Sequence, residues 1–321
     1  MAKYLVTGAA GFIGSHIAAA LASQGDGVRC IDNLATGNRV NLEAISGDVE
    51  FIEADINDAD AIRGACRGIE IVFHEAAIPS VPKSVIDPLS SHQANINGTM
   101  SLLLACKEAK VRRVVYAASS SAYGETPTLP KREDMLPAPI SPYAVQKYCG
   151  ELYLSSFTRV YGLETVSLRY FNVFGPRQDP TSQYSGVLAK FITAMLDGKS
   201  PVVYGNGEQS RDFTYIDNVV RGNLLAASAP AAAVSGRMFN LATSRRITLN
   251  EVIAILRKLT GYTGDVQYAS ERTGDIKHSL ADISAARQAL GYEPQVAFEE
   301  GLARTVEWYR SAQQRNVVNA R

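Results

Sequence analysis

The 321 residues carry 32 basic and 32 acidic side chains, so the formal net charge is zero. This balance argues against a nucleic-acid or anionic-membrane partner, because both require a basic surface. No apolar run approaches the roughly 20 residues of a membrane helix, and the cysteines and histidines lack metal-ligand spacing. We therefore expect a cytoplasmic protein of one or two domains that uses no metal.

The chain opens with an apolar strand at residues 3–7, a turn containing three glycines and a helix from residue 15. Gly8 permits a sharp turn, Gly11 lets the backbone approach a pyrophosphate, and Gly14 lets helix and strand pack closely. The start of the helix adds unpaired N–H groups that favour an anion. This order predicts a dinucleotide-phosphate site, although an ordinary strand-to-helix turn is the alternative. The site comprises Gly8, Gly11, Phe12, Ile13 and Gly14.

Asp32 ends a second predicted strand, about 20 residues past the glycine turn. A carboxylate there accepts the adenosine ribose hydroxyls and repels a 2′-phosphate, which favours NAD over NADP; a helix cap is the alternative role. Asp55 and Ile56 follow the third strand, where the adenine should lie. Ala76 and Ala77 follow the fourth strand, where small residues would let the backbone lie against the cofactor.

Strands and helices alternate over about the first 170 residues, which predicts a doubly wound parallel sheet. The rhythm breaks after Asn172, and residues 238–242 are expected to return to the main sheet as a strand. Two more helices are expected after Thr248. We therefore predict an α/β protein with a Rossmann domain at residues 1–171 plus about 211–245, and a smaller α/β substrate domain at about 172–210 plus 246–321.

Tyr143 and Lys147 stand four residues apart on one predicted helix, so their side chains share a face. Three serines, Ser119, Ser120 and Ser121, end the strand before that helix. A free tyrosine has a pKa of about 10, and both a lysine ammonium and a positive nicotinamide ring can stabilise its phenolate. The YxxxK spacing alone is common, but its place after the fifth strand predicts a general acid/base site.

These motifs together resemble the extended short-chain dehydrogenase/reductases, and within them the UDP-sugar 4-epimerases, over nearly the whole chain. Further motifs that carry the resemblance are Asp32-Asn33, His74-x-Ala76-Ala77, Asn95-x-x-Gly98-Thr99, Ser119-Ser120-Ser121-x-Tyr123-Gly124, Arg169-Tyr170-Phe171-Asn172, Arg211-Asp212-Phe213 and Arg272-x-Gly274-Asp275.

The resemblance implies that Tyr143 takes the proton from the sugar 4-hydroxyl and that Ser119 bridges Tyr143 to the 4-oxygen, with Ser121 as a helper. Which serine points inward stays open. It also implies that the 4-keto sugar turns and regains its hydrogen on the other face, so bound NAD is not consumed. The implied further cofactor contacts are Asn33, Asn95, Tyr143, Lys147 and Tyr170.

The resemblance implies a second group of residues that bind the nucleotide sugar. Asn172, Arg211 and Arg272 would hold the diphosphate, Asp275 the uridine ribose, and Tyr204 would lie near the uracil. Isolated arginines would more simply be surface ion pairs, but forked bonds to phosphate suit this group. The full predicted set is Lys83, Ser119, Ser120, Tyr143, Asn172, Val187, Tyr204, Arg211, Arg272, Asp275 and Ser279.

Two details narrow the predicted substrate. Dehydratases of this superfamily carry an Asp-Glu pair where this chain has Ser120-Ser121, which argues against elimination. Ser279 stands where relatives restricted to unacetylated sugars have a tyrosine, so it leaves room for a 2-acetamido group. A serine that only trims a loop is the alternative, because one residue of a pocket wall discriminates weakly.

We therefore expect a UDP-hexose 4-epimerase that acts on UDP-GlcNAc/UDP-GalNAc and on UDP-Glc/UDP-Gal. The alternatives are a related dehydratase, decarboxylase or uronate epimerase, or a nucleotide-binding protein without turnover. The family is usually dimeric, so a homodimer through the helices near 95–109 and 143–161 is expected, although their apolar residues fit an intrachain core equally well.

Overall fold

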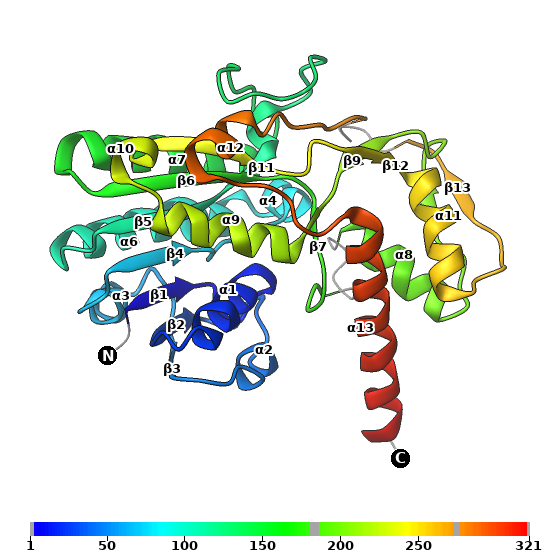
Figure 1. Ribbon diagram of the computed structural model, residues 1–321, viewed down its shortest axis with the longest axis horizontal. Helices are drawn as coiled ribbons and strands as arrows, with labels where there is room; N and C mark the ends of the chain where they lie inside the picture. The colour runs from blue at the N-terminus through cyan, green and yellow to red at the C-terminus, as the bar shows by residue number, and fades with distance from the viewer. Residues whose placement is uncertain (1–2, 180–185, 272–276, 320–321) are drawn as a thin grey trace.

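The computed structural model describes residues 3–179, 186–271 and 277–319, with side chains as far as Gln314. Its centre is a seven-stranded sheet in the order β11-β6-β5-β4-β1-β2-β3, and every neighbouring pair is parallel (Figure 1). The strands are β1 (Tyr4–Thr7), β2 (Val28–Asp32), β3 (Val49–Glu53), β4 (Ile71–His74), β5 (Arg113–Ser119), β6 (Glu164–Tyr170) and β11 (Arg237–Leu241).

The strand order places the ligand cleft. From β1 the chain builds outward through β2 and β3, and then returns to β4 on the other side of β1. In a doubly wound sheet the crevice opens at the carboxyl ends of the strands where the order reverses, which here lies between β1 and β4. These central strands are buried on both faces, which explains their continuous apolar runs.

Helices cover both faces of the sheet. On one face α1 (Phe12–Ser23) packs against α9 (Ile216–Ser228), and on the other α3 (Ala59–Cys66), α6 (Gly98–Glu108) and α7 (Pro142–Tyr161) form a layer (Figure 1). The buried apolar side chains accordingly form two clusters, one on each side of the strands. The predicted doubly wound parallel sheet is confirmed.

Most of the remaining elements form a smaller lobe beside the carboxyl ends of the sheet strands (Figure 1). The others are short helices in the connections between elements. The lobe is built on the long helices α8 (Val187–Leu196), α11 (Leu249–Thr260) and α13 (Phe298–Asn319), which pack against one another. Its strands are β7 (Val173–Phe174), β8 (Val202–Tyr204), β9 (Ser210–Asp212), β10 (Thr214–Tyr215), β12 (Arg246–Thr248) and β13 (Gln267–Ala269). The short helices are α2 (Val40–Glu43), α4 (Val81–Ile86), α5 (Pro88–His92), the π-helical η1 (Gln93–Asn97), the 3-10 turn η2 (Ser120–Tyr123), α10 (Ala231–Val234) and α12 (Ser284–Leu290).

Two expectations about the second half of the chain have different outcomes. Strand β11 pairs with β6, so the predicted return to the main sheet is confirmed. In the described residues after Thr248 there are three helices and not two, because α12 is a separate helix of seven residues. This helix buries only Ala286 and Leu290, which is too few for a helical period to stand out in the sequence. It packs against β11 and α9, and the domain boundaries stay a prediction.

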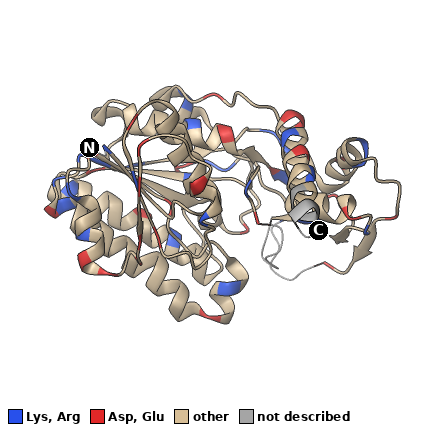
Figure 2. Ribbon diagram, turned by 90° about the horizontal axis from the view of Figure 1, so that it is seen from below, with Lys and Arg blue, Asp and Glu red and all other residues tan. Residues whose placement is uncertain are grey.

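Basic and acidic residues alternate along the ribbon in Figure 2 without gathering on one element, in keeping with the zero net charge. In the described part of the chain, no helix combines the length and apolarity needed to cross a bilayer.

Candidate active site

The glycine turn after β1 forms a cradle that side chains would fill. Gly8 has φ +65°, and a Cβ there would lie 2.6 Å from the backbone nitrogen of Ala76. A Cβ on Gly14 would lie 2.3 Å from the carbonyl oxygen of Gly8. Helix α1 begins at Phe12 with Gly11 as its N-cap and no side-chain cap, so its first N–H groups remain for an anion. This cradle fits a dinucleotide pyrophosphate.

Asp32 lies at the end of β2, beside this cradle. Its carboxylate accepts hydrogen bonds from the backbone N–H groups of Ala10 at 2.9 Å and Leu34 at 2.8 Å. Burial raises the pKa of Asp32, while these hydrogen bonds oppose that rise. The next residue, Asn33, donates to Asp55 at 2.7 Å, which joins the ends of β2 and β3 where an adenosine would lie. Ile56 turns inward and is buried in the core.

Lys147 presents an ammonium group to the cleft. Its side chain is 3% exposed, and Nζ lies 4.8 Å from the centre of the Tyr116 ring. Within the described residues no acceptor lies at hydrogen-bond distance from Nζ. Burial lowers the pKa of Lys147 to about 8, and the charges of Glu75 and Glu151 oppose that shift. A buried ammonium that is left to bond outward fits the ribose hydroxyls of a nicotinamide nucleotide.

Tyr143 lies one turn before Lys147 on α7, and its backbone N–H donates to Ser84 Oγ at 3.0 Å. Burial raises the pKa of Tyr143 to about 12, a hydrogen bond with Ser119 lowers it, and the charge of Glu75 raises it. The expected lowering of this pKa by Lys147 is therefore not seen. Burial, which raises the pKa of Tyr143, has a larger effect than the neighbouring groups of the protein. We expect a positive nicotinamide ring to supply the stabilisation that the phenolate still needs.

The three serines after β5 differ in position. Ser119 caps the turn η2 and lies close enough to Tyr143 to lower its pKa, whereas the Ser121 hydroxyl donates to Ser119 Oγ at 2.8 Å. Ser120 begins the turn and is partly buried. Ser119 is therefore the serine that lies next to Tyr143, and Ser121 contacts Ser119.

Other predicted cofactor residues are tied into the scaffold. Asn95 accepts a hydrogen bond from Ile78 N–H at 2.8 Å and donates to Gln146 at 2.8 Å, so its amide fixes the loop after β4 against α7. Tyr170, at the end of β6, donates its hydroxyl hydrogen to Glu75 at 2.8 Å. Ala77 follows Ala76 in the loop after β4, and Phe12 and Ile13 form the first turn of α1.

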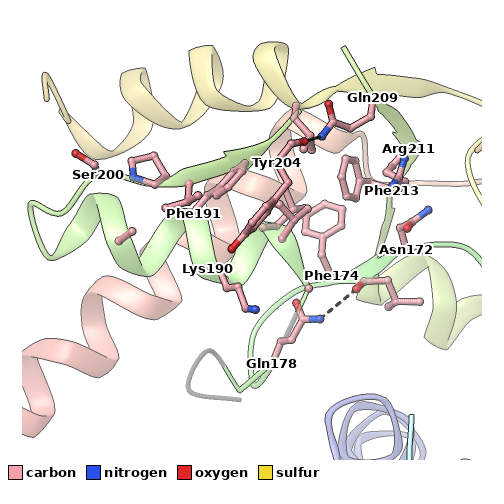
Figure 3. A pocket seen from close by; sticks show the side chains of 18 residues that line it. Asn172, Phe174, Gln178, Lys190, Phe191, Ser200, Tyr204, Gln209, Arg211 and Phe213 are labelled. Carbon is pink, nitrogen blue, oxygen red and sulfur yellow. Dashed lines mark hydrogen bonds between the residues drawn. The ribbon is translucent and has the colours of Figure 1, made fainter. Parts of the chain in front are cut away.

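A cavity of about 530 Å³ opens in the smaller lobe (Figure 3). Aromatic rings of Phe174, Phe191 and Phe213 form much of its wall, and polar groups stand at its edge. It lies where the lobe meets the carboxyl end of β6. The cavity brings together four residues of the predicted substrate set: Asn172, Val187, Tyr204 and Arg211.

Ser279 lies beside this cavity and is joined to Asn172. The Asn172 amide donates to Ser279 Oγ at 3.1 Å and to the carbonyl oxygen of Asp212 at 3.0 Å. Arg211 donates through Nη1 to the carbonyl oxygens of Ser210 and Lys277 at 3.1 Å and 3.0 Å, which holds its guanidinium group against these two residues.

Lys83, also of the predicted substrate set, does not line this cavity. Lys83 lies on α4, which packs against α7. The predicted Arg272 and Asp275 fall outside the described residues.

Sequence reasoning missed several residues of the site. Gln178 and Lys190 line the cavity with the predicted residues (Figure 3). Gln178 follows a Gly-Pro-Arg turn that gives no sign of facing a ligand, and Lys190 is a single cation on an apolar helix. Glu75 was also missed, although it stands inside the motif that ends β4. Within the described residues, no group of three or more His, Cys, Asp or Glu side chains has the geometry of a metal site.

Comparison with known proteins gives the same family. Residues 4–242 match the NAD dependent epimerase/dehydratase family. A UDP-glucose 4-epimerase of Mycolicibacterium smegmatis is 39% identical over 317 residues, which cover 97% of this chain and 100% of the relative. The solved UDP-N-acetylglucosamine 4-epimerase of Methanobrevibacter ruminantium M1, in complex with UDP-N-acetylmuramic acid, is 44% identical with a TM-score of 0.92, covering 97% and 99% of the two chains. A UDP-glucuronic acid 4-epimerase of Bacillus cereus, in complex with UDP-glucuronic acid and NAD, is 35% identical with a TM-score of 0.88, again covering 97% and 99%.

The fold and site define a dinucleotide-dependent enzyme of the Rossmann type. The chain belongs to the NAD-dependent epimerase/dehydratase family, and the three relatives just described, which it matches over nearly their whole length, are named UDP-sugar 4-epimerases. The predicted family, fold, enzyme class and NAD cofactor are confirmed at this level. The relatives differ from one another in the sugar that their names give.

Proposed function

We propose that this enzyme inverts carbon 4 of a UDP-hexose, and that it accepts UDP-GlcNAc and UDP-GalNAc as well as UDP-Glc and UDP-Gal. The observation that carries the proposal is the pairing of Tyr143 and Lys147 on α7 with a cavity that collects four predicted nucleotide-sugar contacts. A binding protein without turnover would have no need of a buried phenol beside a buried ammonium.

Held by the glycine cradle and Asp32, NAD would supply the group that accepts a hydride from carbon 4 of the sugar and returns it to the opposite face. Tyr143 takes the proton of the 4-hydroxyl and gives it back after the keto sugar has turned. Ser119 holds the 4-oxygen close to Tyr143, and Lys147 keeps a positive charge beside the phenolate as it forms. At pH 7 the Lys147 ammonium is charged, because its pKa of about 8 lies above that pH.

The diphosphate and the sugar are proposed to lie between the cavity and α7. Arg211 lines the cavity, and its guanidinium group is proposed to pair with a phosphate. Arg272 and Asp275 keep their proposed roles with the diphosphate and the uridine ribose. Lys83, Ser120 and Val187 are proposed as further contacts. Asn33, Asn95 and Tyr170 are proposed to support the NAD site.

The small side chain of Ser279 supports the choice of acetylated sugars. It is partly buried, and its hydroxyl group is held by Asn172, so a larger side chain there would project into the space beside that contact. The relative from Methanobrevibacter ruminantium, whose name gives UDP-N-acetylglucosamine as its substrate, is 44% identical to this chain. A uronate epimerase remains the second candidate, because the relative from Bacillus cereus carries that name.

Product analysis tests the proposal. NAD-loaded protein is incubated separately with UDP-GlcNAc, UDP-Glc and UDP-glucuronic acid, and the products are separated and identified. We expect the 4-epimers of the first two, with the acetylated sugar converted at least as efficiently. Conversion of UDP-glucuronic acid alone would favour the uronate epimerase, and absence of any conversion would contradict the proposal.

A further inference from the structure

Glu75 lies between the glycine turn and the helix that carries Tyr143. It follows β4 directly, its N–H donates to the carbonyl oxygen of Thr7 at 3.2 Å, and a Cβ on Gly8 would lie 2.9 Å from its carbonyl carbon. Its side chain is partly exposed. Since this loop borders the cleft at the switch point of the sheet, the carboxylate lies at the wall of the proposed NAD site.

A chain of hydrogen bonds fixes the orientation of this carboxylate. The amide of Asn223, on α9, donates to the Tyr170 hydroxyl at 2.9 Å, and that hydroxyl donates to Glu75 Oε1 at 2.8 Å. Asn223 is fully buried and Tyr170 nearly so, so the chain is held by the core. A donor aimed at the carboxylate favours its ionised form.

Glu75 is the carboxylate that is available to balance the positive charge of Lys147. A second carboxylate, Glu151, also acts on Lys147, but it forms two hydrogen bonds with Arg169, at 2.8 Å and 2.7 Å. Glu75 has no cation within ion-pair distance among the described residues, although its charge acts on Lys147 and Tyr143. The cluster therefore contains two cations, Lys147 and Arg169, and two carboxylates, Glu75 and Glu151. Since Glu151 is paired with Arg169, Glu75 is the carboxylate left to balance Lys147.

The other titratable groups around the cluster are neutral. His74 is buried, Thr7 and Thr99 contact its two ring nitrogens at 2.8 Å and 2.9 Å, and burial lowers its pKa to about 3. Burial also raises the pKa values of Tyr116 and Tyr170 well above their usual range. The charge that faces the cleft thus depends on Glu75 and Lys147.

We propose that Glu75 is a positioning residue that balances the charge of Lys147 and thereby favours the oxidised, positively charged nicotinamide ring over its neutral reduced form. The proposal rests on the proposed function, which puts that ring beside Tyr143 and Lys147. In the reaction, the C4–H bond of the sugar breaks, its electron pair reduces the ring, and the hydroxyl proton passes to Tyr143. The ring loses its positive charge in that step, so a nearby carboxylate opposes the reduction.

The ionisation of Glu75 is linked to the state of the ring in both directions. Burial raises the pKa of Glu75 to about 7, while the Tyr170 hydrogen bond and the charge of Lys147 lower it. A positive ring beside it lowers this pKa further, because opposite charges stabilise each other. By linkage, the ionised carboxylate stabilises the oxidised ring by the same free energy.

The test measures the reduction potential of the bound cofactor. NAD-loaded protein, freed of unbound cofactor, is equilibrated with a mediator dye of known potential, and the reduced nicotinamide is followed by its absorbance. Glu75→Gln keeps the shape and removes the charge, so we expect reduction to become roughly tenfold more favourable, about 30 mV for a two-electron couple. Glu75→Asp, which keeps the charge, should restore most of the original potential.

Glu70→Gln is the matched control, because Glu70 precedes β4 at the opposite end of the strand and pairs with Lys3 and Arg112 near the surface. Its bound cofactor should keep the potential of the unchanged protein. A Glu75→Gln potential equal to that of the control, in protein that still converts UDP-sugars, would overturn the inference alone. Failure of the unchanged protein to convert any UDP-sugar would instead overturn the proposed function.

Discussion

Tyr143 and Lys147 occupy successive turns of α7, where both side chains are turned toward β5 and the cleft. The proposed chemistry needs a proton acceptor in a site where burial opposes the charged phenolate. Among the neighbouring groups, Ser119 lowers the pKa of Tyr143 and the charge of Glu75 raises it.

Tyr143→Phe removes the proposed base while keeping the ring that packs in the site. Proton transfer by a positioned side chain contributes roughly 10²–10⁴-fold, so turnover of UDP-sugars should fall by about that factor. The measurement is the rate of epimer formation, with NAD binding measured by calorimetry as the control. Undiminished turnover would show that another group is the base.

Activity should fall as the pH rises above about 8. Burial lowers the pKa of Lys147 to about 8, so its ammonium is charged below that pH and is lost above it, together with its support for the phenolate. A profile of kcat against pH checks this. In Lys147→Arg the charge persists to higher pH, so any remaining activity should lose this alkaline decline; a decline at the same pH in both proteins would assign it to another group.

Ser279→Tyr should act on the acetylated sugars selectively. The added ring projects beside the Asn172 contact, where a 2-acetamido group is proposed to lie. We expect kcat/KM for UDP-GlcNAc to fall at least about tenfold relative to that for UDP-Glc. Ser279→Ala, which stays small, serves as the control. Equal losses for both sugars would show that Ser279 does not select the substrate.

The element that decides cofactor binding is the turn from β1 into α1. Three glycines let the strand, the turn and the helix approach one another more closely than side chains allow. The helix N-terminus then faces the cleft with free N–H groups. The cradle for the dinucleotide is therefore formed by the close approach of β1, the glycine turn and α1, more than by any one side chain.

Gly14→Ala should weaken NAD binding, because the new Cβ would lie 2.3 Å from the Gly8 carbonyl oxygen and must displace backbone. Overpacking of about 1–3 kcal/mol corresponds to roughly 5- to 150-fold in affinity. Calorimetric titration of NAD measures it. Gly64→Ala in α3, where nothing lies within 4 Å of the added Cβ, is the control and should bind NAD normally. Normal binding by Gly14→Ala would contradict this account of the cradle.

At the scale of the whole molecule, helices α6 and α7 leave apolar side chains uncovered. Leu104 on α6 and Val145, Leu152 and Val160 on α7 are all more than 40% exposed. Their neighbours on the inner faces of both helices fill the core, so the outer apolar residues are additional to it. We propose that a second copy covers this surface in a homodimer.

Leu152→Arg should convert that dimer into monomers, because a desolvated charge would face its own symmetry mate. Leu152 is 52% exposed, so the monomer itself should fold normally. Sedimentation of the two proteins measures the change. Val40→Arg, at a residue of α2 that is 62% exposed and far along the chain from this surface, should sediment like the unchanged protein. A monomer before any substitution would contradict the dimer.

The sequence by itself determined the sheet, the glycine turn and the Tyr143–Lys147 pair, because strand runs, turn glycines and helical spacing are local properties of the chain. It also placed β11 back in the main sheet. Only the tertiary structure decided that Gln178 and Lys190 share a cavity with Tyr204, and that Glu75 comes near enough for its charge to act on Lys147. Those groups are brought together by packing between elements distant in the sequence, and no local pattern records such contacts.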